Sequence, residues 1–234
     1  MKAMSREETA IYIKNRVDNG RRVVVTRYGD GEYFLMIGDR NAGKEPHRVV
    51  GPLLRQSVKK KGQLVCVPPI NDVVYRQKNN IFVKTVNYIQ KTGEQELYGT
   101  GAWARWDLDN NNEIFYKFFK GKVLLVSSLS AQAKNIFSHF ETYSMPPNRA
   151  SSKYEESLND ISIIAKEFDN ILFACGPIGK VIIPDIVNIT NANIIDIGHI
   201  LNVLLKHGPQ SSWGRLNAKR GKVDKMIAGI LEKI

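Results

Sequence analysis

Short, continuous apolar runs, separated by longer amphipathic stretches, constrain the fold of this chain most. Runs such as 23–26, 123–126 and 171–174 show no alternation of polar and apolar residues. Strands that are buried on both faces of a parallel sheet have this pattern, because helices cover both faces. We therefore expect a single α/β domain, built as a doubly wound, mostly parallel sheet with helices on both faces.

Strands and helices are expected to alternate up to about residue 206. Ser5 and Glu8 form a capping-box pattern before the first helix, and Gly20 follows its end. This part, residues 1–208, is the predicted domain. The predicted strands are 23–26, 63–67, 97–101, 123–126, 142–145, 171–174 and 194–197, and the predicted helices are 6–19, 33–37, 52–61, 80–91, 107–119, 131–140, 154–168, 179–187 and 199–206.

Residues 209–234 form a different kind of segment, a basic amphipathic tail. Apolar residues such as Met226, Ile230 and Leu231 fall on one helical face, and lysines occupy the other sides. Three interpretations stay open: the tail packs on its own domain, forms the seam of a homodimer, or contacts the inner surface of a membrane. The first is favoured, because amphipathic helices usually cover a core.

Charge and cysteine content narrow the class of protein. The formal net charge is +11, which suits nucleic acid, an acidic membrane surface, an anionic substrate or merely a well-solvated surface. Cys66 and Cys175 lie in apolar runs and are expected to be buried free thiols, without the spacing of a disulfide framework or a zinc site. No apolar run is long enough to span a membrane, and the N-terminus lacks the core of a signal peptide. We expect a cytoplasmic protein.

The hexapeptide from Arg27 to Glu32 directly follows the first apolar run and carries the strongest chemical signal. Asp30 and Glu32 offer hard oxygen ligands of the kind that Mg²⁺ or Mn²⁺ prefers, and such an ion in turn suits a diphosphate. Arg27 adds a cation with fork geometry for phosphate oxygens. Gly29 and Gly31 let the backbone approach a ligand, although Gly-Asp-Gly is also a common turn.

Two later segments also follow predicted strands. Gly176 and Pro177 lead from a strand into a helix, where backbone N–H groups can face an anion, although an ordinary strand-to-helix turn is the alternative. Asp196 and His199 end the last predicted strand, where they could handle a hydroxyl or a proton, although Asp196 could also be a helix cap. Asp107 and Asp109 form another spaced pair, for which capping of the predicted helix 107–119 is the favoured interpretation.

Together, the Arg27–Glu32 segment, Gly176-Pro177 and the Asp196–His199 segment resemble the loops of the GT-D type glycosyltransferases, a family long known only as a domain of unknown function. The resemblance covers about residues 5 to 206. It implies a Rossmann-like fold and a metal-dependent transferase that uses a nucleotide diphosphate sugar. Three departures are visible: only Arg105 stands where the family has a Ser-Arg pair, Lys180 follows the Gly-Pro turn, and Ile200-Leu201-Asn202 stands where the family often has an acidic residue.

The resemblance implies roles for individual residues. Asp30 and Glu32 would hold Mn²⁺ or Mg²⁺. Apart from the resemblance, we expect Asp196 and His199 to line the sugar or acceptor pocket, and we choose Asp196 as the catalytic base. The donor would be a UDP-sugar such as UDP-glucose, and the acceptor a glycan or glycoprotein. The alternatives are a basic nucleic-acid-binding protein, for which no specific motif is present, and a metal-dependent nucleotide-sugar phosphohydrolase. The expected nucleotide-sugar-binding residues are Arg27, Tyr28, Gly29, Gly31, Arg105, Gly176, Pro177 and Lys180.

Overall fold

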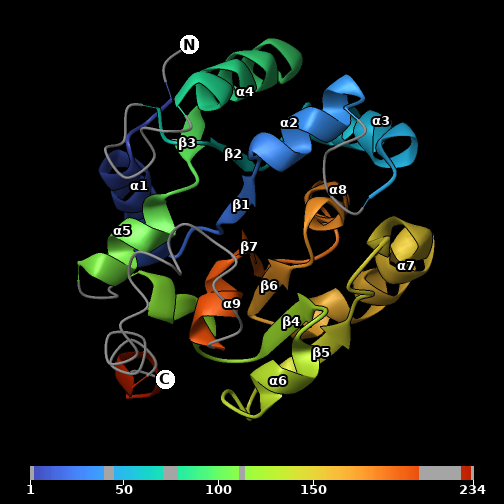
Figure 1. Ribbon diagram of the computed structural model, residues 1–234. Coiled ribbons are helices and arrows are strands. Elements are labelled where there is room, and N and C mark those ends of the chain that lie inside the picture. Colours follow the sequence, from blue (N-terminus) through green and yellow to red (C-terminus); the bar gives the residue numbers. More distant parts are fainter. Residues whose placement is uncertain (1–2, 40–44, 71–78, 111–113, 206–227, 233–234) are drawn as a thin grey trace.

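A seven-stranded sheet with the order β3-β2-β1-β7-β6-β4-β5 forms the centre of the molecule (Figure 1). The computed structural model describes residues 3–39, 45–70, 79–110, 114–205 and 228–232. All neighbouring strands are parallel, so the predicted fold class is confirmed. The strands are β1 (Val24–Arg27), β2 (Leu64–Val67), β3 (Tyr98–Thr100), β4 (Val123–Ser127), β5 (Glu141–Ser144), β6 (Asn170–Ala174) and β7 (Asn193–Asp196).

Helices cover both faces of this sheet (Figure 1). Side chains alternate between the faces, so that Val24 packs in one hydrophobic core and Val25 in the other. Helices α2, α3, α4, α7 and α8 belong to the first core, and α1, α5, α6, α9 and η2 to the second. The helices are α1 (Arg6–Asp18), α2 (Asp30–Ile37), α3 (His47–Ser57), α4 (Asn79–Thr92), α5 (Trp103–Asp109), α6 (Ser130–Lys134), α7 (Tyr154–Ile164), α8 (Pro177–Ile186) and α9 (Ile200–Leu204), with 3-10 helices η2 (Phe115–Phe119), η3 (Ala150–Lys153) and η4 (Ala165–Glu167).

The strand order reverses between β1 and β7. From β1 the chain moves outward to β2 and β3, whereas it reaches β7 from the other half of the sheet, through β6. Open parallel sheets bind ligands at the carboxyl ends of their strands, at this kind of switch point. The order β1-β7-β6 therefore brings the three segments singled out in the sequence to one edge.

Several predicted helices have different bounds. The predicted helix 52–61 is α3, which begins at His47 after Pro46, and the predicted helix 131–140 ends early, at Lys134 of α6. The predicted helix 107–119 is wrong, because α5 ends at Asp109 and η2 begins at Phe115. The predicted helix is divided because the aromatic residues of η2 pack inward around the buried Trp103.

Asp107 has a capping role, but not at the predicted place. It lies near the end of α5, and its buried carboxylate accepts hydrogen bonds from the backbone N–H groups of Ile114 (3.1 Å) and Phe115 (2.7 Å). It thus accepts hydrogen bonds from the backbone N–H groups at the start of η2, rather than from those at the start of its own helix, α5. The predicted capping box of Ser5 and Glu8 is present as expected.

Most of the predicted tail helix lies outside the described residues. Of the part that the structure describes, Ile230 is fully buried in the core that contains α1 and α5. This contact agrees with packing of the tail on its own domain. Among the helices in the described part of the chain, none combines the length and the hydrophobicity needed to cross a membrane.

Candidate functional site

The Asp30-Gly31-Glu32 motif does not lie in a loop, as the sequence suggested, but in the first turn of α2. The helix begins at Asp30 rather than at Tyr33, and Gly29 is its N-cap. Glu32 reaches back, so that its Oε2 accepts a hydrogen bond of 2.8 Å from the backbone N–H of Gly29. The correction has a local cause, because an acidic residue at the third helical position can satisfy a free N–H at the helix start. Asp30 is half-buried and Gly31 exposed.

Lys180, on α8, contacts all three segments that follow strands, which we call the strand-end segments: the Arg27–Glu32 segment, Gly176-Pro177 and the Asp196–His199 segment. Its Nζ lies 3.3 Å from Glu32 Oε1 and 3.1 Å from Asp196 Oδ2, and it donates a hydrogen bond of 3.0 Å to the carbonyl of Gly176. The exposed fractions of the three charged side chains are 7% for Lys180, 12% for Glu32 and 3% for Asp196. Burial by itself would lower the pKa of Lys180, but the two carboxylates outweigh burial and raise it. Lys180 therefore stays charged.

Arg27 ends β1 beside this ion-pair cluster. Its backbone N–H donates to Asp196 Oδ2 (3.1 Å) and its Nη1 to the carbonyl of Ile197 (3.0 Å). Among the described residues its buried Nε has no hydrogen-bond partner. A Cβ at Gly101 would lie 3.4 Å from this Nε, and one at Gly198, where φ is +46°, 3.2 Å from Nη1. Two glycines thus make room for a guanidinium that still has a donor to offer.

Tyr28 points into the core rather than into a ligand site. Its hydroxyl lies 2.7 Å from Ser57 Oγ, and Ser57 donates to the backbone carbonyl of Lys180. Burial raises the pKa of Tyr28 far above its usual range. This chain of contacts joins β1, α3 and α8 beneath the site. The sequence did not point to Ser57, because no local pattern marks a residue whose partner, Tyr28, lies far away along the chain.

His199 is exposed just after β7. The protein around its ring partly excludes water and lowers the pKa of His199, and the positive charges of Arg27 and Lys180 lower it further. At neutral pH the imidazole is therefore mainly uncharged and can accept a proton. Asp196 has a different environment, because both Lys180 and the Arg27 backbone donate to it.

The remaining candidates lie on α5 and at the start of α8. Gly176 is exposed and has a φ of +65°, a conformation that favours glycine, and Pro177 is the first residue of α8. Arg105 lies on α5, where its Nε is 3.6 Å from Asp109 Oδ2. Gly101, whose position directly after β3 could have marked it in the sequence, was missed. The binding roles of these residues stay predictions.

A divalent ion at the predicted ligands does not fit these contacts. One oxygen of Glu32 caps α2 and the other faces the ammonium of Lys180. Within the described residues there is no group of three or more His, Cys, Asp or Glu side chains placed to hold a metal ion. An ion that used Glu32 together with Asp196 would have to displace Lys180. The contacts of Glu32 thus disfavour the predicted Mn²⁺ or Mg²⁺ site, and the role of Asp30 in it stays a prediction.

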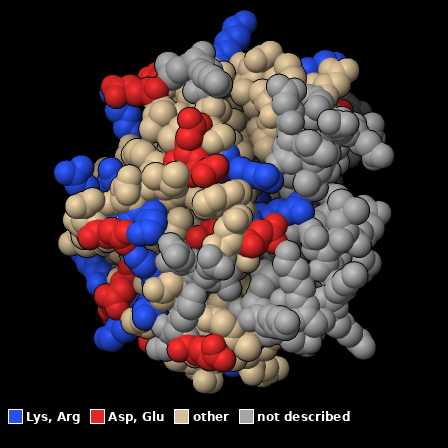
Figure 2. All heavy atoms as spheres, turned by 90° about the vertical axis from the view of Figure 1, so that its left-hand side faces the viewer, with Lys and Arg blue, Asp and Glu red and all other residues tan. Residues whose placement is uncertain are grey.

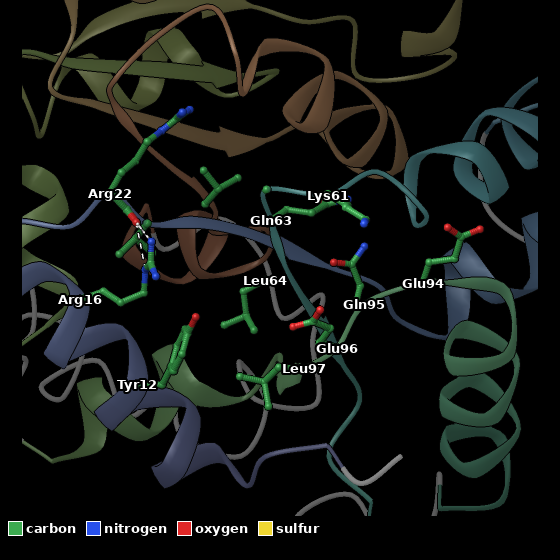
Figure 3. A pocket seen from close by; sticks show the side chains of 13 residues that line it. Tyr12, Arg16, Arg22, Lys61, Gln63, Leu64, Glu94, Gln95, Glu96 and Leu97 are labelled. Atoms are coloured by element: carbon green, nitrogen blue, oxygen red, sulfur yellow. Dashed lines mark hydrogen bonds between the residues drawn. The ribbon is translucent and has the colours of Figure 1, made fainter.

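A pocket of about 420 Å³ lies at the opposite edge of the sheet, at the amino ends of β1 and β2 (Figure 3). Arg16 closes part of it with two hydrogen bonds to the backbone carbonyl of Arg22, while the Arg22 side chain points away, toward the carbonyls of Val187 and Ala192. None of the three strand-end segments lines this pocket. It is separate from the candidate site.

Two basic residues near the end of α3 have partners in the structure. Lys60 forms an ion pair with Asp185, and Arg55 donates to the carbonyl of Met36. On the face in Figure 2, Lys and Arg side chains alternate with Asp and Glu among the described residues, without forming one basic field. The basic residues from 206 to 227 lie outside the described residues.

Comparison with solved structures identifies the fold. A domain of unknown function 1792, described as having a distinct glycosyltransferase fold, matches over 86% of this chain and 79% of its own, with a TM-score of 0.68 and 24% identity. The chain has this glycosyltransferase fold. A glycosyltransferase (DUF1792) from Streptococcus sanguinis matches with a TM-score of 0.66 and 21% identity, over 86% of this chain and 82% of that one. The fold implied by the resemblance of the three segments is thus confirmed. No family model and no curated protein sequence matches the chain.

Proposed function

We propose that this protein is a glycosyltransferase that moves a sugar from a nucleotide diphosphate sugar, expected to be a UDP-sugar such as UDP-glucose, to a hydroxyl of a glycan or glycoprotein. The observation that carries the proposal is the meeting of Arg27, Glu32, Lys180 and Asp196 at the β1–β7 switch point of a glycosyltransferase fold. The carboxyl edge of such a sheet is where nucleotides bind in related architectures.

Charge develops on the diphosphate as the donor bond breaks. The bond between the anomeric carbon and the diphosphate oxygen breaks, and the acceptor oxygen takes its place on that carbon. Arg27 is suited to bind the departing diphosphate, because it is only half-buried at the end of β1 and its guanidinium presents N–H donors in a fork. The positive N-terminal end of α8 contributes in the same direction.

The proton of the acceptor hydroxyl needs a base. Of the two residues considered in the sequence, His199 is better suited than Asp196, because its lowered pKa keeps it neutral near pH 7 and it is exposed. Asp196 is buried and accepts from Arg27 and Lys180, so we assign it the task of holding these cations. This assignment replaces Asp196 by His199 as the proposed base.

A thermal-shift screen of nucleotide sugars, each with and without Mn²⁺, tests the proposal. Ligands that bind the folded state raise the melting temperature by mass action. We expect one UDP-, GDP- or dTDP-sugar to raise it, and Arg27→Met to abolish that shift. Arg21→Met, an exposed arginine before β1, is the matched control and should keep it. Absence of a shift with every nucleotide sugar would contradict the proposal.

Product analysis separates transfer from hydrolysis. A phosphohydrolase would consume the donor at the same rate without an acceptor, whereas a transferase should release sugar slowly and transfer it faster once an acceptor glycan is present. The predicted metal role is tested alongside. If Asp30 holds a metal, Asp30→Ala should abolish transfer while the melting temperature stays near that of the unchanged protein.

A further inference from the structure

The ammonium of Lys180 lies where a bridging cation would lie. Glu32 and Asp196 approach it from α2 and β7, and Gly176 completes its surroundings with a backbone carbonyl. A lysine ammonium has three N–H donors, and these three oxygens can accept all of them. The cation belongs to the chain itself, and it joins three segments that are far apart in the sequence.

A divalent ion would compete with Lys180 for the same oxygens. Glu32 Oε2 already accepts from Gly29, and Asp196 Oδ2 accepts from both Lys180 and the backbone of Arg27. Two positive charges a few ångströms apart repel strongly where water is largely excluded. The buried position of Lys180 therefore makes its removal by an incoming ion costly.

We propose that Lys180 takes the place of a divalent ion at this site, so that donor binding and transfer do not require a metal. The proposal rests on the proposed function for the nature of the donor. Lys180 is a positioning residue: it fixes Glu32 at the start of α2 and Asp196 at the end of β7, and Asp196 in turn holds the Arg27 backbone. Arg27, half-buried at the end of β1, is left to contact the diphosphate.

A titration with Mn²⁺ alone tests this proposal without any donor. We expect the unchanged protein to show no stoichiometric Mn²⁺ binding in calorimetry or by electron paramagnetic resonance. In Lys180→Gln the two carboxylates lose their cation, and Mn²⁺ should bind at least about tenfold more tightly, because a repelling charge is gone. Lys166→Gln, an exposed lysine in η4, is the matched control and should behave like the unchanged protein.

Stoichiometric Mn²⁺ binding to the unchanged protein would overturn the proposal, and so would Mn²⁺ binding that is no tighter in a folded Lys180→Gln variant than in the unchanged protein. If Lys180→Gln does not fold, the titration of the unchanged protein still decides, and Lys180→Arg, which keeps the charge, should show the same absence of Mn²⁺ binding.

Donor binding gives a second readout. The thermal shift with the active nucleotide sugar should be the same in EDTA as in Mn²⁺ for the unchanged protein. A shift that appears only with Mn²⁺ would refute the metal-free mechanism while supporting the proposed function. Absence of any nucleotide shift would refute the proposed function, whereas the Mn²⁺ titration would still test the role of Lys180.

Discussion

At the scale of single residues, Glu32 has both a structural and a charge-compensating task. Its Oε2 caps α2 at Gly29, and its Oε1 faces Lys180. Removal of one partner from a buried ion pair costs more than the pair itself contributes, because a charge is left without compensation. Variants of Glu32 can therefore separate the cap from the charge.

Glu32→Ala should lower the free energy of unfolding by about 1–3 kcal/mol, because it removes both the cap and the carboxylate. Glu32→Gln keeps an acceptor for Gly29 and should cost less. Midpoints of urea unfolding, with the slope checked for constancy, measure the difference. Equal losses for the two variants would show that the Gly29 cap adds nothing to stability.

His199 gives the site a dependence on pH. Its pKa lies below the usual 6.5, so the unfolded chain binds more protons than the folded protein between that lowered pKa and 6.5. Stability should therefore rise with pH across this window and fall as pH decreases through it. Unfolding free energies measured from pH 5 to pH 8 should show this slope, and His199→Asn should reduce it.

The pH dependence of transfer should follow the same group. Transfer should decrease as pH falls through the lowered pKa of His199, because a protonated imidazole cannot accept the acceptor's proton. Initial rates at saturating donor measure this acidic limb. An unchanged limb in a folded His199→Gln variant that retains transfer would remove His199 as the base.

At the scale of elements, the contact between α2 and α3 positions the start of α2. A Cβ at Gly51 would lie 2.4 Å from the backbone carbonyl of Leu35, so the helices touch through a position that needs glycine. Gly51→Ala should therefore push α2 away from α3 and cost about 1–3 kcal/mol of unfolding free energy. Thermal unfolding measures the cost, and the donor-induced shift should shrink with it.

Gly31, in α2 itself, differs from Gly51 because a larger side chain has room there. Nothing lies within 4 Å of a Cβ at this position, and its φ is not in the left-handed region. Gly31→Ala should raise the stability of α2 by up to about 1 kcal/mol, because alanine favours the helix. If a ligand approaches the backbone here, the same variant should bind the donor more weakly. A more stable variant with unchanged donor binding would exclude Gly31 from the binding surface.

At the scale of the whole molecule, charge distribution bears on the nucleic-acid alternative. Among the described residues on the face in Figure 2, Lys and Arg alternate with Asp and Glu, and Lys60 is paired with Asp185, whereas the +11 net charge belongs to the whole sequence. Binding to nucleic acid should therefore be weak and should decline steeply with salt, without a specific component. Filter binding at about 50 and about 200 mM salt measures this decline. Tight binding that persists at the higher salt would support the nucleic-acid role instead.

The sequence predicted those features of the fold and the site that depend on residues close together along the chain, and missed those that depend on distant residues. The strand runs, the first capping box and the three strand-end segments depend on residues close in sequence, so local patterns revealed them. The division of 107–119 depends on how the aromatic residues of η2 pack around Trp103, and local helix spacing gives no sign of it. The same applies to the Tyr28–Ser57 contact.

The sequence by itself determined the sheet, its buried strands and the segments that follow them, because apolar periodicity and turn glycines act over a few residues. Only the tertiary structure decided that Lys180 lies between Glu32 and Asp196, and that Asp196 holds the backbone of Arg27, 169 residues away. The strand order β1-β7-β6 creates these contacts. Compensation of buried charge depends on distance in space, which a linear pattern does not contain.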